Sequence, residues 1–315
     1  MENERQTGLH VSVLLDECIE NLNIDPDGIY LDGTLGMGGH SYEIASRLSS
    51  GRLICIDRDE TAIERAGRRL APFGDRVTLV HGNFSDAAAI LDSLGIAGVD
   101  GMLFDLGVSS PQLDEAERGF SYMADAPLDM RMDRGSALTA SEIVNTWDEA
   151  RLNRILWDYG EERWARRVTA AILKSRERKP IETTLELADI IRSAMPAAAL
   201  REKQHPAKRT FQAIRIAVND ELGAIAAMMD TAPDKLRIGG RLCVISFHSL
   251  EDRIVKSGIH ARENGCTCPR EAPVCTCGFK QTLRSVSRKP ILPSAEELER
   301  NPRSRSAKLR VAERV

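Results

Sequence analysis

The sequence predicts an α/β fold, a doubly wound and mostly parallel sheet that is interrupted by a helical insertion. Short apolar runs alternate with amphipathic stretches over residues 10–110, which is the pattern of successive βαβ units. A glycine-rich turn follows the first apolar run, and an acidic residue ends the second. Near residue 112 the pattern becomes helical, and the α/β pattern returns near residue 206. We therefore expect a core domain of residues 1–111 and 206–315, with residues 112–205 as a helical insertion domain.

The first strand, residues 30–32, leads into a turn in which Gly38 and Gly39 precede a helix. Glycine allows a sharp turn, and a ligand can approach main-chain N–H groups where no Cβ stands. The second apolar run ends in Asp57, nineteen residues after Gly38. Nucleotide-binding βαβ units place the acceptor for the ribose hydroxyls at this spacing. Together these features predict a cofactor that contains adenosine.

The form of the turn distinguishes between such cofactors. A dinucleotide fold uses G-x-G-x-x-G, because the pyrophosphate sits on the helix N-terminus. Here Ser41 follows the glycines and the third glycine position is not met. Asp32, at the end of the first strand, would repel a pyrophosphate but would suit a cationic group. S-adenosylmethionine carries an ammonium and a sulfonium and no phosphate, so the turn favours this methyl donor over NAD.

Two further strands are expected near residues 75–84 and 98–107. Asn83 and Phe84 stand at the end of the third strand, and Asp105 stands at the end of the fourth. Ligands of parallel α/β sheets bind outside the carboxyl ends of the strands. The ends of the first four strands therefore predict one binding crevice.

The predicted insertion holds every tryptophan of the chain, and we expect these side chains to pack a small helical core. They are Trp147, Trp157 and Trp164. Thr183 and Glu186 fit the N-cap and N3 positions of a capping box, which predicts a helix that starts there.

Beyond the insertion the sequence predicts a long helix at residues 210–230, a buried strand at 241–249 and a helix at 250–260. Two late strands, near residues 289–292 and 306–315, are expected to complete the edge of the sheet.

The segment after the fourth strand, residues 105–114, carries a second strong signal. In methyl-transfer folds this position faces the reacting methyl group, and enzymes acting on exocyclic amines of bases often carry Asp/Asn-Pro-Pro-aromatic there. Such an amine attacks well only when acceptors draw on its N–H bonds. Asp105, Ser109 and Ser110 are therefore the candidates for the reacting centre. The alternative is a plain strand-to-helix turn in which Ser110-Pro111 begins a helix.

Composition places the chain among soluble globular proteins. Its 315 residues are 42% hydrophobic and 29% charged, and no apolar run approaches the ~20 residues that span a bilayer. The N-terminus lacks the basic and apolar regions of a signal peptide. We therefore expect a cytoplasmic protein with no membrane partner.

Charge is unevenly distributed along the chain. Residues 1–157 hold 13 Arg, no Lys and 27 acidic residues, a net charge of −14. Residues 158–315 hold 30 basic and 20 acidic residues, a net charge of +10. The basic residues cluster at 163–179, 201–209, 284–289 and 303–310. A single cluster is commonly a solvated helix face, but four in one half favour a surface that meets RNA or the ribosome.

Four of the seven cysteines form a C-x-C-x₆-C-x-C array. They are Cys266, Cys268, Cys275 and Cys277. Four thiolates close in sequence can form a tetrahedral zinc site. The spacing differs from the common C-x₂-C pairs, and cytosolic chains also carry reduced cysteines without metal. The array predicts a structural clasp on a hairpin, with or without zinc.

At this point the sequence resembles a known family, the bacterial 16S ribosomal RNA cytosine-N4 methyltransferases (RsmH/MraW family). The resemblance runs nearly from end to end, and its motifs are long enough to be specific. The matching segments are residues 10–17, 32–41, 105–114, 117–121, 127–133, 159–162, 211–222 and 246–252.

The resemblance implies a class I S-adenosylmethionine-dependent methyltransferase, a Rossmann-like core with a helical insertion. It implies methylation of the exocyclic N4 of a cytosine in the decoding region of 16S rRNA, in the small ribosomal subunit, and leaves a homodimer open. Carried onto this sequence, it places the methyl donor against Gly38, Gly39, His40, Asp57, Phe84, Asp105 and Gln112. The cysteine array is not universal in the family, which argues against a part in catalysis.

Two other functions share this fold. A small-molecule methyltransferase would usually close its pocket with apolar residues, whereas the C-terminal half of this chain is basic. A ribosome-binding factor without catalysis would be expected to lose cofactor residues, and Asp32, Gly38, Gly39 and Asp57 are all intact.

Overall fold

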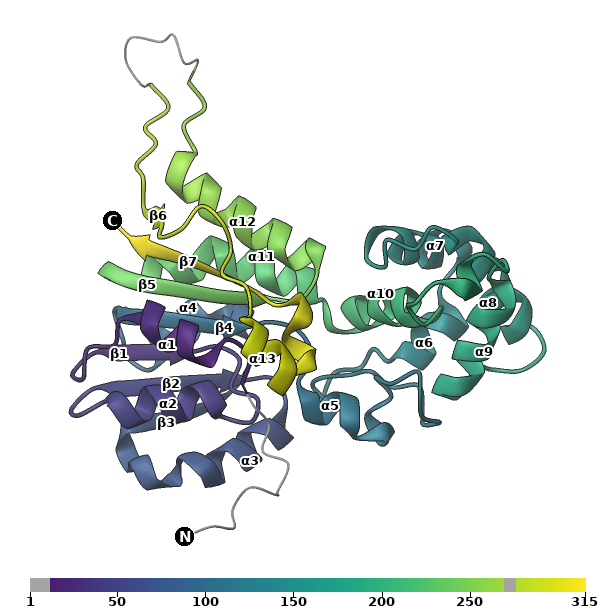
Figure 1. Cartoon of the computed structure of the whole chain (residues 1–315), viewed down its shortest axis with the longest axis horizontal. Coiled ribbons are helices and arrows are strands. Elements are labelled where there is room, and N and C mark those ends of the chain that lie inside the picture. The colour runs from purple at the N-terminus through teal and green to yellow at the C-terminus, as the bar shows by residue number, and fades with distance from the viewer. Residues whose placement is uncertain (1–11, 269–275) are drawn as a thin grey trace. The chain divides into compact units, whose positions relative to one another are not determined.

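The structure, a computed structural model, describes residues 12–268 and 276–315. The chain divides into two compact units (Figure 1). Residues 1–107 and 222–315 form a sheet unit, and residues 108–221 form a helical unit. Along the chain, the helical unit is therefore inserted between the fourth and fifth strands of the sheet unit. It starts earlier and ends later than the expected residues 112–205.

The sheet unit contains a seven-stranded sheet in the order β3-β2-β1-β4-β5-β7-β6. The strands are β1 (Ile29–Asp32), β2 (Arg52–Asp57), β3 (Val77–His81), β4 (Val99–Asp105), β5 (Leu236–Ser246), β6 (Leu283–Ser285) and β7 (Lys308–Arg314). The helices are α1 (Leu15–Leu22), α2 (Gly39–Arg47), α3 (Glu60–Leu70), α4 (Ala87–Ser93), α11 (Glu221–Thr231), α12 (Ser249–Asn264) and α13 (Ala295–Arg300).

Strands β1 to β5 run parallel, and β7 lies antiparallel between β5 and β6. Without β7 the order is 3-2-1-4-5-6, the order of doubly wound nucleotide-binding sheets. The chain reverses its direction of winding between β1 and β4, which lie side by side. Ligands of such sheets bind outside the carboxyl ends of the strands at this switch point.

Helices cover both faces of the sheet (Figure 1). Strand β2 shows how the sequence produces this arrangement, because its side chains alternate between two apolar clusters. Leu53 and Cys55 join α1, α2 and α3, whereas Ile54 and Ile56 join α4, α11 and α12. Strands that are buried on both faces read as continuous apolar runs, which is why residues 53–56 were recognisable in the sequence.

The helical unit has a core of its own, to which its helices contribute. They are α5 (Ser110–Asp114), α6 (Ala140–Thr146), α7 (Glu149–Asp158), α8 (Ala165–Arg176), α9 (Thr184–Ala194) and α10 (Lys208–Asn219). The predicted capping box is confirmed, since Thr183 caps α9 and pairs with Glu186.

The expectation that all three tryptophans pack the helical core is wrong for one of them. Trp147 and Trp164 pack against the core, but Trp157 is 61% exposed. The buried face of α7 is formed by Leu152 and Leu156, and Trp157 follows Leu156 by one residue, about 100° around the helix. Its side chain therefore leaves the buried stripe.

The expected helix at residues 210–230 is in fact two helices, α10 and α11. Asp220 lies between them in the left-handed region, with a φ of 46°, and ends α10. Phe211 and Ile214 of α10 are buried in the helical core, which is why the helical unit extends to residue 221 and not to the predicted residue 205. Arg215 spans the break through two hydrogen bonds of 2.8 Å to Glu221.

The first of the two expected late strands is also wrong. Residues 289–292 form no strand, and only Ile291 makes an isolated bridge, to Leu309. Pro290 lies within this segment and Pro293 follows it, and proline has no N–H to donate to a ladder. The edge strand of the sheet is β6, at residues 283–285, and the last expected strand is confirmed as β7.

Asn219 provides a stability test for the end of α10. Its side-chain amide donates to the carbonyls of Met130 (2.8 Å) and Arg215 (2.9 Å), and its Oδ1 accepts from the Met132 N–H at 2.8 Å. Asn219→Ala leaves buried backbone groups without these partners. We expect it to lower the free energy of unfolding by about 2–4 kcal/mol in urea titrations.

The matched control for Asn219→Ala is Asn21→Ala. Asn21 donates one hydrogen bond within its own helix and is only partly buried, so its loss should cost less than about 0.5 kcal/mol. Equal costs for the two variants would contradict the structural role assigned to Asn219.

Candidate functional site

The glycine-rich turn joins the end of β1 to the start of α2. Gly36 and Gly38 both have positive φ, at 50° and 72°, and Gly38 is the N-cap of α2. Only glycine adopts this region without strain, so the turn depends on both residues. Gly39 has a different role, because a Cβ there would lie 1.8 Å from the Oγ of Ser12. Its missing side chain therefore makes room for residue 12.

Asp32 anchors this turn from the end of β1. The side chain is 1% exposed, and its carboxylate accepts from Ser41 Oγ at 2.6 Å and from the Thr34 N–H at 3.1 Å. Burial raises the pKa of Asp32 to about 6, against the effect of these hydrogen bonds. Ser41 stands where a dinucleotide fold has its third glycine. Its hydroxyl ties α2 to β1, which gives a structural reason for the departure from that pattern.

Asp57 holds the turn from the end of β2. One carboxylate oxygen accepts from the Gly36 N–H and the other from the Asp59 N–H, each at 2.8 Å. Burial raises the pKa of Asp57. The side chain stays partly accessible, and each oxygen retains a lone pair that ribose hydroxyls could use. The predicted acceptor thus lies at the predicted strand end.

Asp105 stands at the end of β4, next to β1. Its backbone N–H donates to Thr34 Oγ1 at 2.5 Å, which joins the two strand ends. Within the part of the chain that the structure describes, its buried Oδ1 has no hydrogen-bond partner. Burial, together with the negative charges of Asp32 and Glu251, raises the pKa of Asp105 to about 8. This carboxyl group is therefore largely protonated near neutral pH.

His40 faces Asp105 from the first turn of α2. Its Nε2 lies 3.0 Å from the carbonyl oxygen of Val13, and its Nδ1 lies 4.0 Å from Asp105 Oδ2. A carbonyl only accepts, so Nε2 carries the proton and a neutral ring presents an unprotonated Nδ1 towards Asp105. The ring is 6% exposed. His40 thus lies beside the predicted reacting carboxyl, fixed by the segment before α1.

Phe84 lies at the end of the third strand, in a short 3₁₀ helix (Phe84–Asp86) that Asn83 caps. Its ring meets that of Phe104 edge to face, with centroids 6.0 Å apart. Gly33 makes this possible, because a Cβ there would lie 2.2 Å from Phe104 Cε1. Phe84 remains partly exposed, as a side chain that packs on an adenine must be.

Ser109, Ser110 and Gln112 belong to the helical unit, whereas Asp105 belongs to the sheet unit. Ser109 is the N-cap of α5, and its N–H donates to Gln112 Oε1 at 3.0 Å in a capping box. Ser110 is the first residue of the helix, followed by Pro111. The structure therefore gives this segment the helix-starting role that the sequence left as an alternative.

Glu251 is a residue that sequence reasoning missed. It is fully buried in the first turn of α12, where its Oε2 accepts from the N–H groups of Phe247 (2.7 Å) and His248 (3.2 Å). His248 and Glu251 form a capping box. Histidine is an uncommon N-cap, so the pattern at the fifth strand end did not stand out. Glu251 affects the site through its negative charge, which raises the pKa of Asp105.

Part of the predicted basic surface is already neutralised. In the cluster at residues 303–310, Lys308 and Arg310 both form ion pairs with Asp252, at 3.3 and 2.6 Å. Arg310 is 13% exposed. Arg305 is exposed in the 3₁₀ helix Pro302–Ser306, just before β7. Lys308 and Arg310 therefore each have a partner within the chain.

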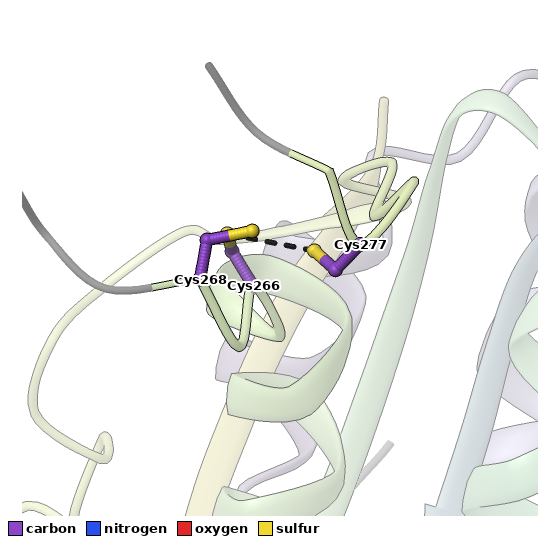
Figure 2. Close-up of side chains that lie close together, drawn as sticks. All are labelled: Cys266, Cys268 and Cys277. Atoms are coloured by element: carbon purple, nitrogen blue, oxygen red, sulfur yellow. Dashed lines mark hydrogen bonds between the residues drawn. The ribbon is translucent and has the colours of Figure 1, made fainter. Parts of the chain in front are cut away.

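Three of the four predicted metal ligands gather at one place. The Sγ atoms of Cys266, Cys268 and Cys277 all lie within 4.8 Å of one another (Figure 2). Cys275, the fourth, lies outside the described residues. These cysteines are at the far end of α12, away from Ser249, the residue with which the helix begins after β5.

The sheet order and the carboxylates at the ends of β1, β2 and β4 define a class I S-adenosylmethionine-dependent methyltransferase fold. Within this class the chain belongs to the MraW methylase family, whose model matches residues 7–315. In the described ranges, 12–268 and 276–315, no helix has both the length and the apolar character to cross a membrane.

Curated relatives match almost the whole chain. A Brevibacillus brevis protein named ribosomal RNA small subunit methyltransferase H is 57% identical over 307 residues, 97% of this chain and 98% of that protein. A Clostridioides difficile protein of the same name is 54% identical, covering 97% of this chain and 99% of its own length. Among solved structures, a putative rRNA-methylase from Clostridium thermocellum has a TM-score of 0.46 at 12% identity, over 98% of this chain and 100% of that one.

The pKa of Asp105 leads to a test of stability against pH. The folded-state value of about 8 exceeds the ordinary 3.8, so the folded protein keeps a proton that the unfolded chain releases. This group's contribution to stability is therefore lost as pH rises from about 4 to about 8. Asp105→Asn removes the titration. We expect the free energy of unfolding of the variant, relative to that of the wild type, to rise by up to roughly 2–3 kcal/mol between pH 6 and pH 8.5.

Urea unfolding of the ligand-free protein at both pH values measures this difference. The control is Asp100→Asn, the same substitution at the other end of β4, where the carboxylate pairs with Arg237. A constant difference between Asp105→Asn and wild type at the two pH values would mean that Asp105 is already ionised at pH 6.

Proposed function

We propose that this protein transfers a methyl group from S-adenosylmethionine to the exocyclic N4 of a cytosine in the decoding region of 16S rRNA, in the cytoplasm. The observation that carries the proposal is similarity over 97% of the chain, at 57% identity, to a protein named ribosomal RNA small subunit methyltransferase H. The carboxyl group at the end of β4 supports the choice of an amine as the acceptor of the methyl group.

The described residues fit this methyl donor. Asp105 has a buried Oδ1 without a hydrogen-bond partner in the described structure, which a cationic ligand would satisfy. Asp57 and Phe84 are partly accessible at neighbouring strand ends, where they would hold the ribose and the adenine. The donor would supply a methyl group from its sulfonium, and the rest of the donor would leave as a neutral thioether. Burial costs Asp32 and Asp105 stability in their ionised forms, and a bound cation would offset that cost whereas a phosphate would add to it.

Asp105 is the residue we assign to the amine. The lone pair of a cytosine N4 is conjugated with the ring, and an acceptor on one N–H bond makes it available. An exocyclic amine must also lose a proton once it has gained a methyl group. A cationic donor bound beside Asp105 would favour its ionised form, which can then accept this proton. Once the donor has lost its charge, a pKa near 8 would let the carboxyl group hold the proton close to neutral pH. His40 lies beside this carboxyl group, with its Nδ1 4.0 Å from Asp105 Oδ2, which is too far for a hydrogen bond.

The cytosine must leave its base pair and its stack before N4 can be aligned for attack. Catalysis would then rest mostly on alignment. From their place after the fourth strand we extend the assignment to Ser109 and Ser110, as residues bordering the cytosine. The family resemblance adds Gln112 as a contact of the methyl donor. A homodimer is not needed for any of these roles.

The test is mass spectrometry of rRNA nucleosides from cells with and without this protein. We expect N4-methylated cytidine in 16S rRNA to disappear without the protein and to return with the wild-type gene. Loss of a different modified nucleoside would overturn the choice of N4. Unchanged rRNA would favour the small-molecule methyltransferase, or the non-catalytic ribosome-binding factor if the purified protein also transfers no methyl group.

Asp105→Asn should lower turnover on small-subunit rRNA by 10²-fold or more, because the amide cannot take the amine proton at neutral pH. Asp100→Asn, on the same strand, should leave turnover unchanged. Single-turnover methylation with radiolabelled donor measures both. Wild-type turnover by Asp105→Asn would remove Asp105 from the reacting centre.

Arg305 tests the RNA surface more cleanly than Lys308 or Arg310. Lys308, the first residue of β7, lies opposite Ser246 in the ladder between β5 and β7, at the carboxyl end of β5. Because Arg305 comes just before Lys308, it lies towards the edge of the sheet that carries the site. Arg305→Glu should weaken RNA binding and flatten its dependence on salt, because fewer counterions are released. Filter binding at several salt concentrations measures the slope.

The matched control is Arg52→Glu, since Arg52 is also exposed but begins β2 at the opposite edge of the sheet. Affinity for the methyl donor should be the same in both variants. Identical salt slopes for Arg305→Glu and Arg52→Glu would exclude Arg305 from the RNA surface.

A further inference from the structure

Two arms of the chain run side by side beyond the end of α12 (Figure 1). The first arm continues α12 through residue 268, and the second, residues 276–282, leads into β6. The Thr282 N–H donates to the carbonyl of Arg262 at 3.0 Å. Phe279 packs on Gly265 so closely that a Cβ there would lie 2.7 Å from its ring. Contacts that involve no cysteine therefore already hold the two arms together.

The cysteines lie where these arms approach each other. Cys266 and Cys268 come from the first arm and Cys277 from the second, and Figure 2 shows their side chains directed towards one another. All three sulfur atoms lie within 4.8 Å of one another, and those of Cys266 and Cys277 are 3.6 Å apart. This separation is far from the ~2.05 Å of a disulfide. A tetrahedral zinc site with Zn–S bonds of ~2.3 Å places its sulfur atoms about 3.8 Å apart.

The backbone around the cluster favours sulfur in its thiolate form. The Thr276 N–H donates to Cys268 Sγ at 3.3 Å, across the two arms. Donors of this kind offset negative charge on a sulfur and orient it.

We propose that Cys266, Cys268 and Cys277 bind one Zn²⁺ ion, which fastens the two arms into a structural clasp. Three thiolates in a cytosolic chain select a soft, tetrahedral ion such as zinc over Mg²⁺ or Ca²⁺. Binding releases the thiol protons, so affinity rises with pH. The sequence spacing makes Cys275 the expected fourth ligand, but that residue lies outside the described structure and the proposal does not depend on it.

The clasp is separate from the methyl-transfer site. Strand β6 runs parallel to β5, since both are antiparallel to β7, and Leu283 begins β6 directly after the second arm. The clasp therefore lies towards the amino ends of the parallel strands, whereas Asp32, Asp57 and Asp105 lie at their carboxyl ends. Zinc would hold the hairpin and take no part in the reaction, so its test does not depend on the proposed function.

The experiment measures metal in the full-length protein, purified with a phosphine reductant and without chelator. Elemental analysis after zinc loading and dialysis should give about one zinc per chain. Replacement by Co²⁺ should give the sulfur-to-cobalt charge-transfer bands and the strong visible bands of a tetrahedral thiolate site. Cys266→Ser and Cys277→Ser should each lower bound metal at least tenfold, and Cys18→Ala, which changes a buried core cysteine, should not.

A measurement on the unmutated chain keeps the proposal falsifiable if a variant fails to fold. Zinc should slow alkylation of Cys266 and Cys277 by iodoacetamide at least tenfold, as read by peptide mass spectrometry. Removal of zinc by a chelator should leave the affinity for S-adenosylmethionine unchanged. Failure to retain zinc, cobalt spectra without charge-transfer bands, or a Cys266–Cys277 disulfide in freshly purified protein would each overturn the proposal.

Discussion

The site depends on one constraint, the burial of acidic side chains at the carboxyl ends of parallel strands. Asp32 is almost fully buried, and it keeps a charge there only because Ser41 and the Thr34 backbone donate to it. Those donors come from the turn that the carboxylate itself shapes. Asp105 has no such support for Oδ1 in the described chain, so burial leaves it protonated. The cationic groups of a bound methyl donor would favour the ionised form of both carboxyl groups, so such a donor offsets the cost of burying them.

Much of this arrangement could be predicted from the sequence because it is local. The apolar run of β2, the glycines of the turn and the position of Asp57 each follow from residues within about twenty of one another. The parallel order of β1 to β4 then brings Asp32, Asp57 and Asp105 to one edge. Ser41 marked a departure from the dinucleotide pattern in the sequence, but its role as the partner of Asp32 needed the structure.

The errors came from features that periodicity does not encode. Asp220 ends α10 in a left-handed conformation, which aspartate adopts without any glycine to announce it. Trp157 has a large apolar side chain, as core residues often do, but it lies one position past the buried stripe of α7 and is exposed. Glu251 acts on Asp105 through the charge of a buried carboxylate contributed by a helix that starts about 140 residues later in the chain. Such long-range pairings are set by the tertiary fold.

The uneven distribution of charge along the chain is a second case in which the tertiary fold decides what the sequence pattern cannot. Arg310 pairs with Asp252 and Arg262 pairs with Asp234, all within the C-terminal half. Pairs of this kind cancel equal numbers of opposite charges, so the excess of +10 in that half survives them. They do decide which cations remain available to an anionic partner, and composition cannot. The proposed RNA surface therefore has to be sought among exposed cations such as Arg305, near the edge of the sheet that carries Asp105, and the density of a basic run does not identify them.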